Sequence, residues 1–291
     1  MKQFAVIGHP IAHSLSPLLH NAAFDHLGLD CRYEAFDIAP EALPKALSEF
    51  REKGFEGLNV TLPHKEPVAG LVNTITGEAR AVGAVNTISF RGGRITGDNT
   101  DIYGFTASVE NVRATIERRA VLLLGAGGTA RAVIYALLSH FKPAEIIVAN
   151  RNEQRSRDLV EHFAPYAGTS ELKADSGDPK NLRAHIERAD LIVNCTSLGL
   201  SPAVEGCPVS DDTVFRTSQV VVDLIYTPLQ TRLLGLAARS GARTISGLEM
   251  FLHQGARSFE IWLGQVMPID TLRPIIVHEL ERQRKEPLPR Q

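Results

Sequence analysis

A glycine-rich segment stands between an apolar run and a helical pattern near the middle of the chain. The run Ala120–Leu124 is followed by Gly125-Ala126-Gly127-Gly128-Thr129-Ala130, which fits the spacing GxGxxG/A. In this spacing the first glycine permits a tight turn, the second lets the backbone approach a pyrophosphate, and a small third residue lets the next helix pack closely. The amino end of that helix offers N–H groups and a positive dipole to phosphate. The segment predicts a dinucleotide site, and the alternative is a glycine-rich turn without a ligand.

The residues after the next apolar strand indicate which dinucleotide is bound. An NAD site places a carboxylate at the end of this strand, where it holds the ribose 2′-hydroxyl. Here Glu145–Ala149 is followed by Asn150-Arg151-Asn152, with Arg155 close behind, and the first carboxylate comes only at Glu153. Arginine binds a phosphate through two parallel hydrogen bonds, whereas a carboxylate repels it. The pattern favours NADP over NAD, although Arg155 fits a solvated helix start equally well.

Two pairs of polar residues in the first hundred positions are spaced so that each pair can contact one ligand. Ser14 and Ser16 carry hydroxyls two residues apart, which suits hydrogen bonding to an anion such as a carboxylate. Ser16 has a structural alternative, because serine followed by proline is a common helix cap. Asn59 and Thr61 alternate with Val60 on a predicted strand, so they face one side of it. That side is either a ligand site or a solvent-facing surface.

Four further residues have ordinary structural interpretations when each is considered alone. Lys65 alone indicates a surface lysine, and Asp101 before a helical pattern is typical of an N-cap. Tyr226 follows a buried strand, where tyrosine usually packs, and Gln254 is a neutral polar position in a helix. Only their occurrence together with the serine and Asn59–Thr61 pairs favours a small-molecule site.

The elements that must position these residues alternate in type along the whole chain. Strands are predicted over 4–7, 33–38, 57–61, 84–90 and 94–97, with a hairpin turn at Gly92-Gly93, and helices over 16–27 and 41–53. Strands of the fully buried kind, apolar without alternation, over 120–124, 145–149, 191–195 and 220–224 then alternate with helices, which predicts a parallel, doubly wound sheet. Long helices are predicted over 101–118 and 248–263, and we expect the second to return to the first domain. The segment 171–189 is harder to assign, and the tail 282–291 is expected to fray.

Length and composition are those of a two-domain globular protein. The chain has 291 residues, 44% hydrophobic and 22% charged, which is enough to bury sizeable cores. Its net charge of −2 argues against general binding to nucleic acid or to an acidic membrane surface. The three cysteines form no CxxC pair, the apolar run at 4–7 is too short for a signal peptide, and no stretch approaches a membrane span. We therefore expect a cytoplasmic protein with no metal site and no nucleic-acid or membrane partner.

The order of these motifs resembles the shikimate dehydrogenase family over almost the whole chain. The family's first signature is similar to Gly8-His9-Pro10-Ile11-Ala12-His13-Ser14-Leu15-Ser16-Pro17 with His20-Asn21, and its second to Asn59-Val60-Thr61-Leu62-Pro63-His64-Lys65. Further matching segments are 83–87, 97–101, 125–130, 150–151, 194–199, 223–226 and 247–254. So many specific motifs in one order do not arise by chance.

The resemblance implies an α/β fold of two domains with an active-site cleft between them. The substrate domain would comprise 1–104 and 247–291, and the Rossmann-like NADP domain 105–246. The implied activity is the reversible NADPH-dependent reduction of 3-dehydroshikimate to shikimate, on the pathway to chorismate and aromatic amino acids. The implied catalytic pair is Lys65 and Asp101, and the substrate-binding residues are Ser14, Ser16, Asn59, Thr61, Asn86, Tyr226 and Gln254. The cofactor residues are Gly125, Ala126, Gly127, Gly128, Thr129, Ala130, Asn150, Arg151, Asn152, Arg155, Thr196, Leu224 and Gly247.

Ketone reduction requires a pair of the kind that the resemblance assigns. The carbonyl oxygen becomes alkoxide-like as the carbon gains a hydride, and a charged Lys65 beside it can stabilise and protonate that oxygen. Asp101 would keep the lysine oriented, so we treat the two groups as one coupled unit.

Three positions depart from the family's usual residues, and alternatives stay open. Asn152, Leu200 and Thr227 stand where the family commonly has Thr, Met and Asn, but none of them belongs to the proposed catalytic pair. One alternative is an enzyme that also uses quinate or prefers NAD. Others are a catalytically silent NADP-binding sensor and a different two-domain dehydrogenase, such as a folate-dependent one. The sequence also leaves a homodimer open.

Overall fold

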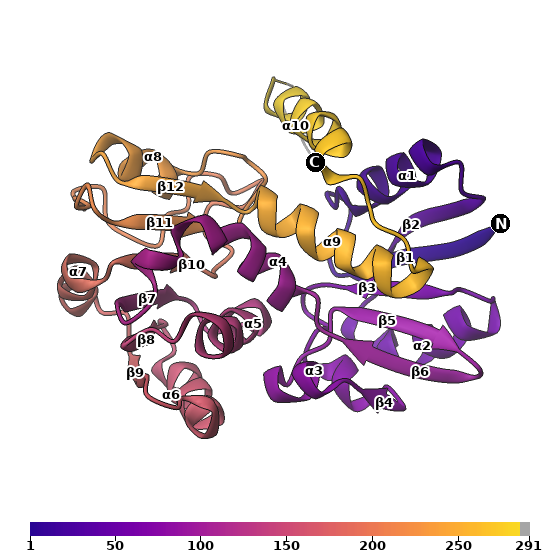
Figure 1. The fold of residues 1–291 in the computed structure, drawn as a ribbon, viewed down its shortest axis with the longest axis horizontal. Helices are drawn as coiled ribbons and strands as arrows, with labels where there is room; N and C mark the ends of the chain where they lie inside the picture. The colour runs from indigo at the N-terminus through magenta and orange to yellow at the C-terminus, as the bar shows by residue number, and fades with distance from the viewer. Residues whose placement is uncertain (286–291) are drawn as a thin grey trace. The chain divides into compact units, whose positions relative to one another are not determined.

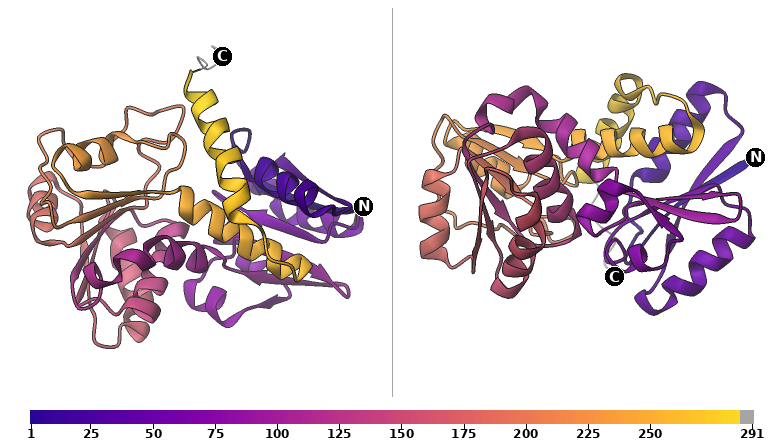
Figure 2. Two further views of the ribbon diagram at one scale, coloured as in Figure 1. Left: turned by 45° about the horizontal axis from the view of Figure 1, so that its top comes forward. Right: turned by 60° about the horizontal axis from the view of Figure 1, so that its bottom comes forward.

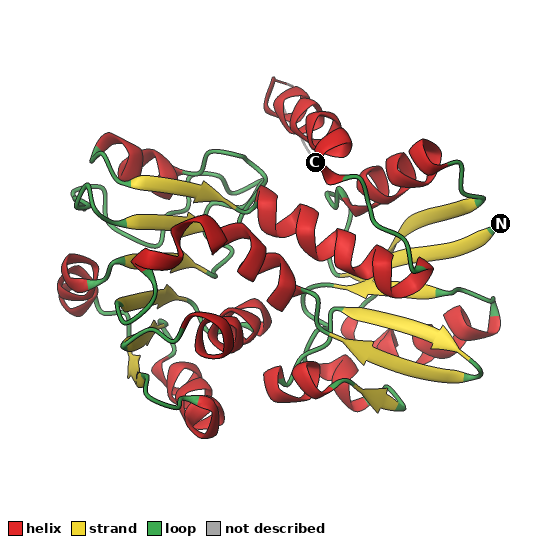
Figure 3. Ribbon diagram, viewed as in Figure 1, coloured by secondary structure: helices red, strands yellow, loops and turns green. Residues whose placement is uncertain are grey.

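The computed structural model describes residues 1–285, and the chain divides into two compact units (Figure 1). Unit 1 comprises Met1–Gly104 and Leu252–Glu279, and unit 2 comprises Phe105–Phe251 and the residues from Leu280 onward. Each unit has its own six-stranded sheet with helices packed against it (Figure 3). None of the helices in the described part of the chain is long and apolar enough to cross a membrane.

The sheet of unit 1 mixes parallel and antiparallel strands in the order β2-β1-β3-β5-β6-β4. β1 pairs with β2 and β3 in parallel, whereas β5 runs antiparallel to both β3 and β6. The predicted hairpin is confirmed, since β5 and β6 are joined by Gly92 and Gly93, both with positive φ. The strands are β1 (Lys2–Gly8), β2 (Cys31–Asp37), β3 (Gly57–Val60), β4 (Thr74–Ile75), β5 (Thr87–Arg91) and β6 (Arg94–Asp98).

Helices cover both faces of this sheet, and the alternation of side chains on β1 shows how. Phe4 faces α1 and α9, where its ring centroid lies 5.7 Å from that of Phe24 and 5.0 Å from that of Trp262. Ala5 and Ile7 point to the opposite face and join a core cluster with α2. The helical segments are α1 (Ser16–Leu27), η1 (Pro40–Ala42), α2 (Leu43–Glu52), η2 (Pro67–Gly70), α3 (Gly77–Val82), α9 (Leu248–Leu263) and α10 (Ile269–Lys285).

The pair His20-Asn21 attaches α1 to β2. The Asn21 side chain donates to the Tyr33 carbonyl and accepts from the Tyr33 N–H, both at 2.9 Å. His20 stacks on the Tyr33 ring at 4.3 Å, and neither of its ring nitrogens has a hydrogen-bond partner within the described residues. Burial lowers the pKa of His20 to about 3, so the imidazole stays neutral at physiological pH.

The end of α9 lies against β3 and β5 at a contact that requires glycine. The Trp262 indole N–H donates to the Ile88 carbonyl at 2.9 Å. A Cβ atom at Gly57 would lie 2.2 Å from Trp262 Nε1, closer than any side chain allows. Gly57 therefore lets the indole lie directly on the strand that carries Asn59.

The sheet of unit 2 is fully parallel, in the order β12-β11-β10-β7-β8-β9, as predicted for a doubly wound fold. The chain builds the sheet outward from β7 to β9 and then resumes at β10 on the other side of β7. This change of direction puts the topological switch point between β7 and β10. The strands are β7 (Ala120–Leu124), β8 (Glu145–Ala149), β9 (Glu171–Asp175), β10 (Leu191–Asn194), β11 (Val220–Asp223) and β12 (Arg243–Ser246).

Helices lie on both faces of the sheet of unit 2 (Figure 2). Leu122, Ile147 and Val221 pack with Ile186 of α7 and Leu233 of α8 in one core cluster. The helical segments are α4 (Asp101–Val109, from Phe105 in this unit), η3 (Glu110–Thr115), α5 (Gly128–Ala136), η4 (Leu137–Phe141), α6 (Glu153–Phe163), η5 (Ala164–Tyr166), α7 (Pro179–Arg188) and α8 (Arg232–Arg239).

The single helix predicted over 101–118 is wrong. α4 ends at Val109, and the chain continues as η3, within which Val112 has non-helical angles of φ −122° and ψ 19°. Asn111 and the β-branched Val112 both lower helix propensity. Arg113 donates to the His140 carbonyl at 2.7 Å, a tertiary contact that sequence periodicity does not reveal.

The structure also settles two segments that the sequence pattern left poorly defined. Residues 171–189 contain β9 and α7, and α7 begins with a cap in which Asp178 accepts from the Lys180 N–H, with Pro179 in the first turn. The tail predicted to fray from 282 is helical in α10 as far as Lys285, and 286–291 lie outside the described residues.

The Gly57 contact leads to a stability prediction. Gly57→Ala should lower the free energy of unfolding by about 1–3 kcal/mol, because the added methyl overlaps the buried indole. Urea unfolding followed by Trp262 fluorescence measures the change. Gly70→Ala is the matched control, since no atom lies within 4 Å of a Cβ there. Equal stability of the two variants would mean that α9 does not lie on β3 in this way.

Candidate active site

A lysine and an aspartate form a buried ion pair in unit 1. Lys65 follows β3 in a short loop, and Asp101 is the first residue of α4. The distance between Lys65 Nζ and Asp101 Oδ2 is 2.6 Å, and the two side chains are 11% and 5% exposed. The surface interpretation of Lys65 is therefore wrong. Removing two charges from water costs free energy, so a buried ion pair is tolerated only with good geometry and further hydrogen bonds.

Asn86 supplies one of those hydrogen bonds and holds the carboxylate in place. Its Nδ2 donates to Asp101 Oδ1 at 2.8 Å, and its Oδ1 accepts from the Thr100 N–H at 2.7 Å. Because a backbone N–H can only donate, the amide oxygen must face Thr100, and the amide nitrogen must face Asp101. Asn86 thus presents a fixed donor to the aspartate, so the side chain of Asp101 acts beyond the N-cap role that its sequence position suggests.

Asn59 extends this hydrogen-bond network toward the sheet. Its Oδ1 accepts from the Tyr33 hydroxyl at 2.7 Å, and its Nδ2 lies 2.9 Å from Ser258 Oγ and 3.2 Å from Thr87 Oγ1. The amide is only 6% exposed, and protein groups already use both of its ends. This engagement is typical of a residue that positions its neighbours rather than one held open for a ligand.

The remaining predicted substrate residues lie at different places. Ser14 is half-buried, and its Oγ accepts from the Ser16 N–H at 3.3 Å. Ser16 is the first residue of α1, and no side-chain cap hydrogen bond forms there, so the helix-cap interpretation of Ser16 is not supported. Thr61 and Gln254 are half-buried in unit 1. Tyr226 belongs to unit 2, where its ring stacks on Phe251 at 4.4 Å.

Sequence reasoning did not single out the hydroxyls that complete this network. Thr87, Thr100 and Ser258 lie within 3.2 Å of one another, and Tyr33 fixes Asn59 from the other side. Thr87 and Thr100 fall inside matching motifs, so a signal existed for them. Tyr33 and Ser258 belong to a strand and a helix face that indicate only packing.

In unit 2, the glycine segment forms the turn between β7 and α5. Gly125 has φ +105°, a conformation that favours glycine, and a Cβ there would lie 2.8 Å from Thr196 Cγ2. Thr196 follows β10, so this contact lies at the switch point between β7 and β10. Gly127 is the N-cap of α5 and has no atom within 4 Å of a Cβ position. The first turn of α5 contains no acidic residue, and its amino end is thus open to an anion.

Two arginines follow β8, the strand that pairs with β7 in the sheet. Arg151 and Arg155 are exposed, and no ion pair to either guanidinium occurs within residues 1–285. Arg157, which like Arg155 lies in α6, is different, since it pairs with Glu153 at 2.7 Å. Asn152 caps α6 by accepting from the Gln154 N–H, and Asn150 donates to the Asn152 carbonyl at 2.8 Å. The two asparagines shape the loop, while the two arginines remain available for a phosphate.

The last two predicted cofactor residues touch each other at the carboxyl ends of β11 and β12. A Cβ at Gly247 would lie 2.1 Å from the Leu224 carbonyl oxygen, so only glycine fits at this position. Glycine turns, exposed arginines and strand ends thus meet the requirements of a bound NADP: an open cradle for the pyrophosphate and cationic groups for the 2′-phosphate. The residues present fit the cofactor.

A buried carboxylate also lies at the end of β11. Asp223 accepts hydrogen bonds from Asn194 Nδ2 at 3.0 Å, from the Ile225 N–H at 3.1 Å and from the Thr231 hydroxyl at 2.6 Å. Burial nevertheless raises the pKa of Asp223 to about 6, against a usual value of 3.8. Its hydrogen bonds join the end of β10 to the segment that follows β11.

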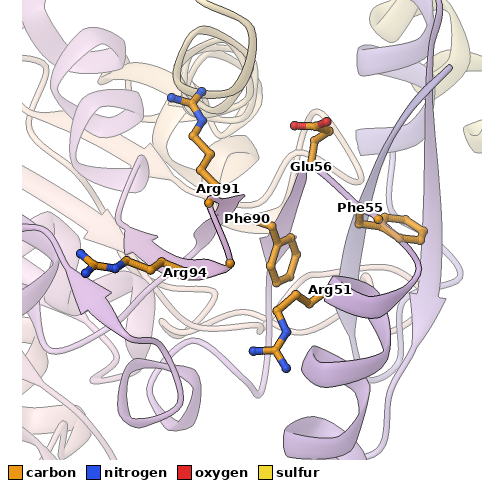
Figure 4. Close-up of a pocket in the computed structure, with 9 residues that line it drawn as sticks. Arg51, Phe55, Glu56, Phe90, Arg91 and Arg94 are labelled. Carbon is orange, nitrogen blue, oxygen red and sulfur yellow. The ribbon is translucent and has the colours of Figure 1, made fainter.

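A separate pocket in unit 1 lies at the other end of the strands and lacks a convergent set of groups. It has a volume of about 270 Å³ and lies between the start of β3 and the β5–β6 turn. Figure 4 shows the side chains of Arg51, Arg91 and Arg94 pointing in different directions. Arg91 is used within the protein, since it donates to the Ile261 carbonyl at 2.6 Å. We therefore place the candidate active site at Lys65 and Asp101.

The parallel sheet with its glycine turn and the buried Lys65–Asp101 pair together define a dinucleotide-dependent oxidoreductase. The chain belongs to the shikimate dehydrogenase family. Residues 6–88 match its substrate binding domain, 108–224 match the family described as shikimate / quinate 5-dehydrogenase, and 247–274 match the shikimate 5′-dehydrogenase C-terminal domain.

Individual relatives cover nearly the full chain. The shikimate dehydrogenase (NADP(+)) of Symbiobacterium thermophilum is 42% identical over 96% of this chain and 94% of its own length. A solved structure of shikimate 5-dehydrogenase from Thermus thermophilus, in complex with NADP(H) and shikimate, is 36% identical, with a TM-score of 0.81 over 97% of this chain and 99% of that one. Quinate dehydrogenase from Corynebacterium glutamicum, in complex with NAD, is 28% identical, with a TM-score of 0.85 over 95% and 99% of the two chains.

The pKa of Asp223 predicts a pH dependence of stability. Because the folded state holds this proton more tightly than the unfolded state, the group stabilises the fold at low pH, and that contribution is lost as the pH rises from about 4 to about 6. The difference between 3.8 and about 6 corresponds to about 3 kcal/mol. Asp223→Asn, which does not titrate, should lack this component.

Urea unfolding of the wild type and Asp223→Asn, measured from pH 4.5 to 7.5, tests the prediction. The wild type should lose stability relative to the variant as the pH rises to about 6, and the difference should then level off. Parallel stability curves for the two proteins over the whole range would show that Asp223 ionises normally in the fold.

Proposed function

We propose that this enzyme catalyses the reversible NADPH-dependent reduction of 3-dehydroshikimate to shikimate, a step on the route to chorismate and aromatic amino acids. The observation that carries the proposal is the buried Lys65–Asp101 pair within a network of amides and hydroxyls. The Symbiobacterium relative, a shikimate dehydrogenase (NADP(+)), supports it at 42% identity, as do the two ligands held by the Thermus enzyme.

Different segments of the chain would bind the substrate and the cofactor. Residues 1–104 and 247–291 would form the substrate domain, and 105–246 the NADP domain. Family membership supports this division, because the matching substrate binding and C-terminal domains lie at 6–88 and 247–274. The three cysteines are free thiols, which suits the reducing cytoplasm as the place of action.

Lys65 and Asp101 would provide the proton that the carbonyl oxygen gains during reduction. NADPH supplies the hydride for ketone reduction when bound, and NADP⁺ accepts it in the reverse direction. The Lys65 ammonium hydrogen-bonds the carbonyl oxygen of the substrate, stabilises its growing negative charge and provides the proton that completes the alcohol. Asp101 holds the ammonium in place from 2.6 Å, and Asn86 holds the carboxylate. We therefore treat the lysine and the aspartate as one coupled unit.

Other polar residues would recognise the rest of the substrate. We assign the carboxylate to Ser14 and Ser16 and the ring hydroxyls to Thr61 and Gln254, and the family resemblance adds Tyr226 to the carboxylate set. Asn59 and Asn86 complete the set, although both amides already bond protein groups, so their contribution is mainly to position the others.

The cofactor residues divide by the part of NADP that they contact. Gly125, Ala126, Gly127, Gly128, Thr129 and Ala130 hold the pyrophosphate at the start of α5. Arg151 and Arg155 bind the 2′-phosphate, with Asn150 and Asn152 shaping their loop. Thr196, Leu224 and Gly247 form the strand-end surface for the nicotinamide end.

A two-by-two oxidation assay tests the function. Shikimate and quinate are each offered with NADP⁺ and NAD⁺, and nicotinamide absorbance is followed. We expect turnover mainly with shikimate and NADP⁺.

In Arg151→Ala, the affinity for NADPH should fall roughly 10- to 100-fold, because a hydrogen-bonded charge contact is lost, whereas the affinity for NADH should change little.

Arg157→Ala is the matched control, because Arg157 lies in α6, which begins two residues after Arg151, and its guanidinium is already paired with Glu153. It should bind NADPH like the wild type. Comparable turnover of quinate, or with NAD⁺, would indicate the dual-specificity enzyme that the Corynebacterium relative exemplifies. A folded wild type that binds NADPH but turns over neither substrate would indicate a silent sensor.

Lys65→Ala tests the catalytic pair. Turnover of shikimate should fall by about 10²- to 10⁴-fold, the usual contribution of a positioned acid–base group. Stability should fall too, since Asp101 loses its buried counter-charge, and NADPH binding by fluorescence titration checks that the variant is folded. Lys53→Ala removes an exposed lysine of the same unit and should leave kcat unchanged. A Lys65→Ala enzyme with kcat within tenfold of the wild type would disprove the assignment.

A further inference from the structure

Ser258 lies at the junction of the buried polar network in unit 1. It belongs to α9, is 0% exposed, and comes from a part of the chain more than 150 residues away from its partners. Its Oγ lies 2.8 Å from Thr87 Oγ1, 3.2 Å from Thr100 Oγ1 and 2.9 Å from Asn59 Nδ2, and it also donates to the Gln254 carbonyl at 3.1 Å. A single hydroxyl thus bonds β3, β5, the residue before α4, and its own helix.

Backbone groups settle the direction of the hydrogen bonds around Ser258. Asn59 Nδ2 lies 3.3 Å from the Asn86 main-chain carbonyl, which can only accept, so the nitrogen of this amide must face the hydroxyls. The Tyr33 hydroxyl occupies the amide oxygen on the other side. Asn59 therefore donates to Ser258, and Ser258 donates its own proton to the Gln254 carbonyl, which can only accept.

Further hydrogen bonds link Ser258 to the catalytic pair through Thr87, Thr100 and Asn86. Thr87 Oγ1 donates to Asn86 Oδ1 at 3.0 Å, and Asn86 Nδ2 donates to both Thr100 Oγ1 and Asp101 Oδ1. The hydroxyls of Thr87, Thr100 and Ser258 form a closed triangle. Loss of the Ser258 hydroxyl removes one hydrogen-bond partner from each threonine, so the two threonines hold the Asn86 amide, and through it Asp101, less firmly.

We propose that Ser258 is a positioning residue for the reduction and oxidation steps, acting through Thr87, Thr100 and Asn86 on the Lys65–Asp101 pair. This inference rests on the proposed function. Ser258 also bonds the main chain of Gln254 one turn earlier on α9, so the same hydroxyl sets α9 in register with the ends of β3 and β5. The helix that carries a substrate residue and the strands that carry Asn59 and Thr87 are thereby held in one geometry.

The role predicts an effect on turnover rather than on binding of the cofactor. In Ser258→Ala, kcat for shikimate oxidation should fall roughly tenfold, the size expected for one buried hydrogen bond that holds a reacting group. The KM for shikimate should change less than about threefold, and the dissociation constant of NADPH should stay the same.

Ser108→Ala is the matched control. Ser108 is also a buried serine on a helix, and its hydroxyl bonds a carbonyl of its own helix, at Phe105, at a distance of 2.7 Å. It shares burial, helical context and the local hydrogen bond with Ser258, but within residues 1–285 it has no hydrogen bond to the triangle of hydroxyls. Its kcat should equal that of the wild type.

A double-mutant cycle separates positioning from a general structural role. Thr87→Val removes a neighbouring hydroxyl at nearly constant volume, and it should lower kcat by a similar factor on its own. Because both hydroxyls act through Asn86, Ser258→Ala combined with Thr87→Val should lower kcat little more than either change alone. The combination of Ser108→Ala with Thr87→Val should lower kcat only as Thr87→Val does. Thermal unfolding of all variants shows that each is folded at the assay temperature.

Four outcomes would overturn the inference. Ser258→Ala with kcat within twofold of the wild type would do so, as would Ser258→Ala and Thr87→Val effects that simply multiply. If Ser258→Ala does not fold, Thr87→Val alone decides, and an unchanged kcat in that variant would refute the role. A wild type without any shikimate turnover would refute the proposed function together with this inference, whereas normal wild-type turnover confines a failure to Ser258.

Discussion

The buried ion pair between Lys65 and Asp101 is the constraint on which the rest of unit 1 depends. Two opposite charges at 2.6 Å, almost out of contact with water, are tolerated only if the surrounding protein supplies the hydrogen bonds that water gave. Asn86 donates one such bond to the carboxylate, and Thr100 fixes Asn86 through its backbone N–H. The polar network is therefore the condition for keeping a charged lysine where a reacting oxygen can meet it.

The network also explains why this unit is assembled from distant parts of the chain. Asn59, Thr87, Thr100 and Ser258 come from different elements, yet their polar atoms lie within 3.2 Å of a neighbour in the set. Apolar packing brings the elements close: Gly57 admits the Trp262 indole, and this contact places α9 on β3 and β5. The hydroxyls then select one register among those that packing alone would allow, because an unpaired buried hydroxyl is costly.

The sequence predicted much of the fold because its signals are local. Glycine turns, capping residues and fully apolar strands are read within a few positions, so the parallel sheet of unit 2, the β5–β6 hairpin and the glycine turn at Gly125 are confirmed. The helix predicted over 101–118 is wrong because its end depends on a contact between residues far apart in the sequence. Arg113 bonds the His140 carbonyl, and a tertiary bond of this kind outweighs weak helix propensity.

The sequence by itself determined the class of chemistry, because the glycine spacing, the absence of a carboxylate after β8 and the ordered motifs are properties of residue type and order. Tertiary structure alone decided which ordinary residues matter. Lys65 and Asp101 have surface and capping interpretations until burial brings their side chains to 2.6 Å, and Tyr33 and Ser258 give no signal at all. The physical reason is that the strength of a polar contact depends on its removal from water and on the other groups that bond it at the same time. The residue spacing within one segment specifies neither.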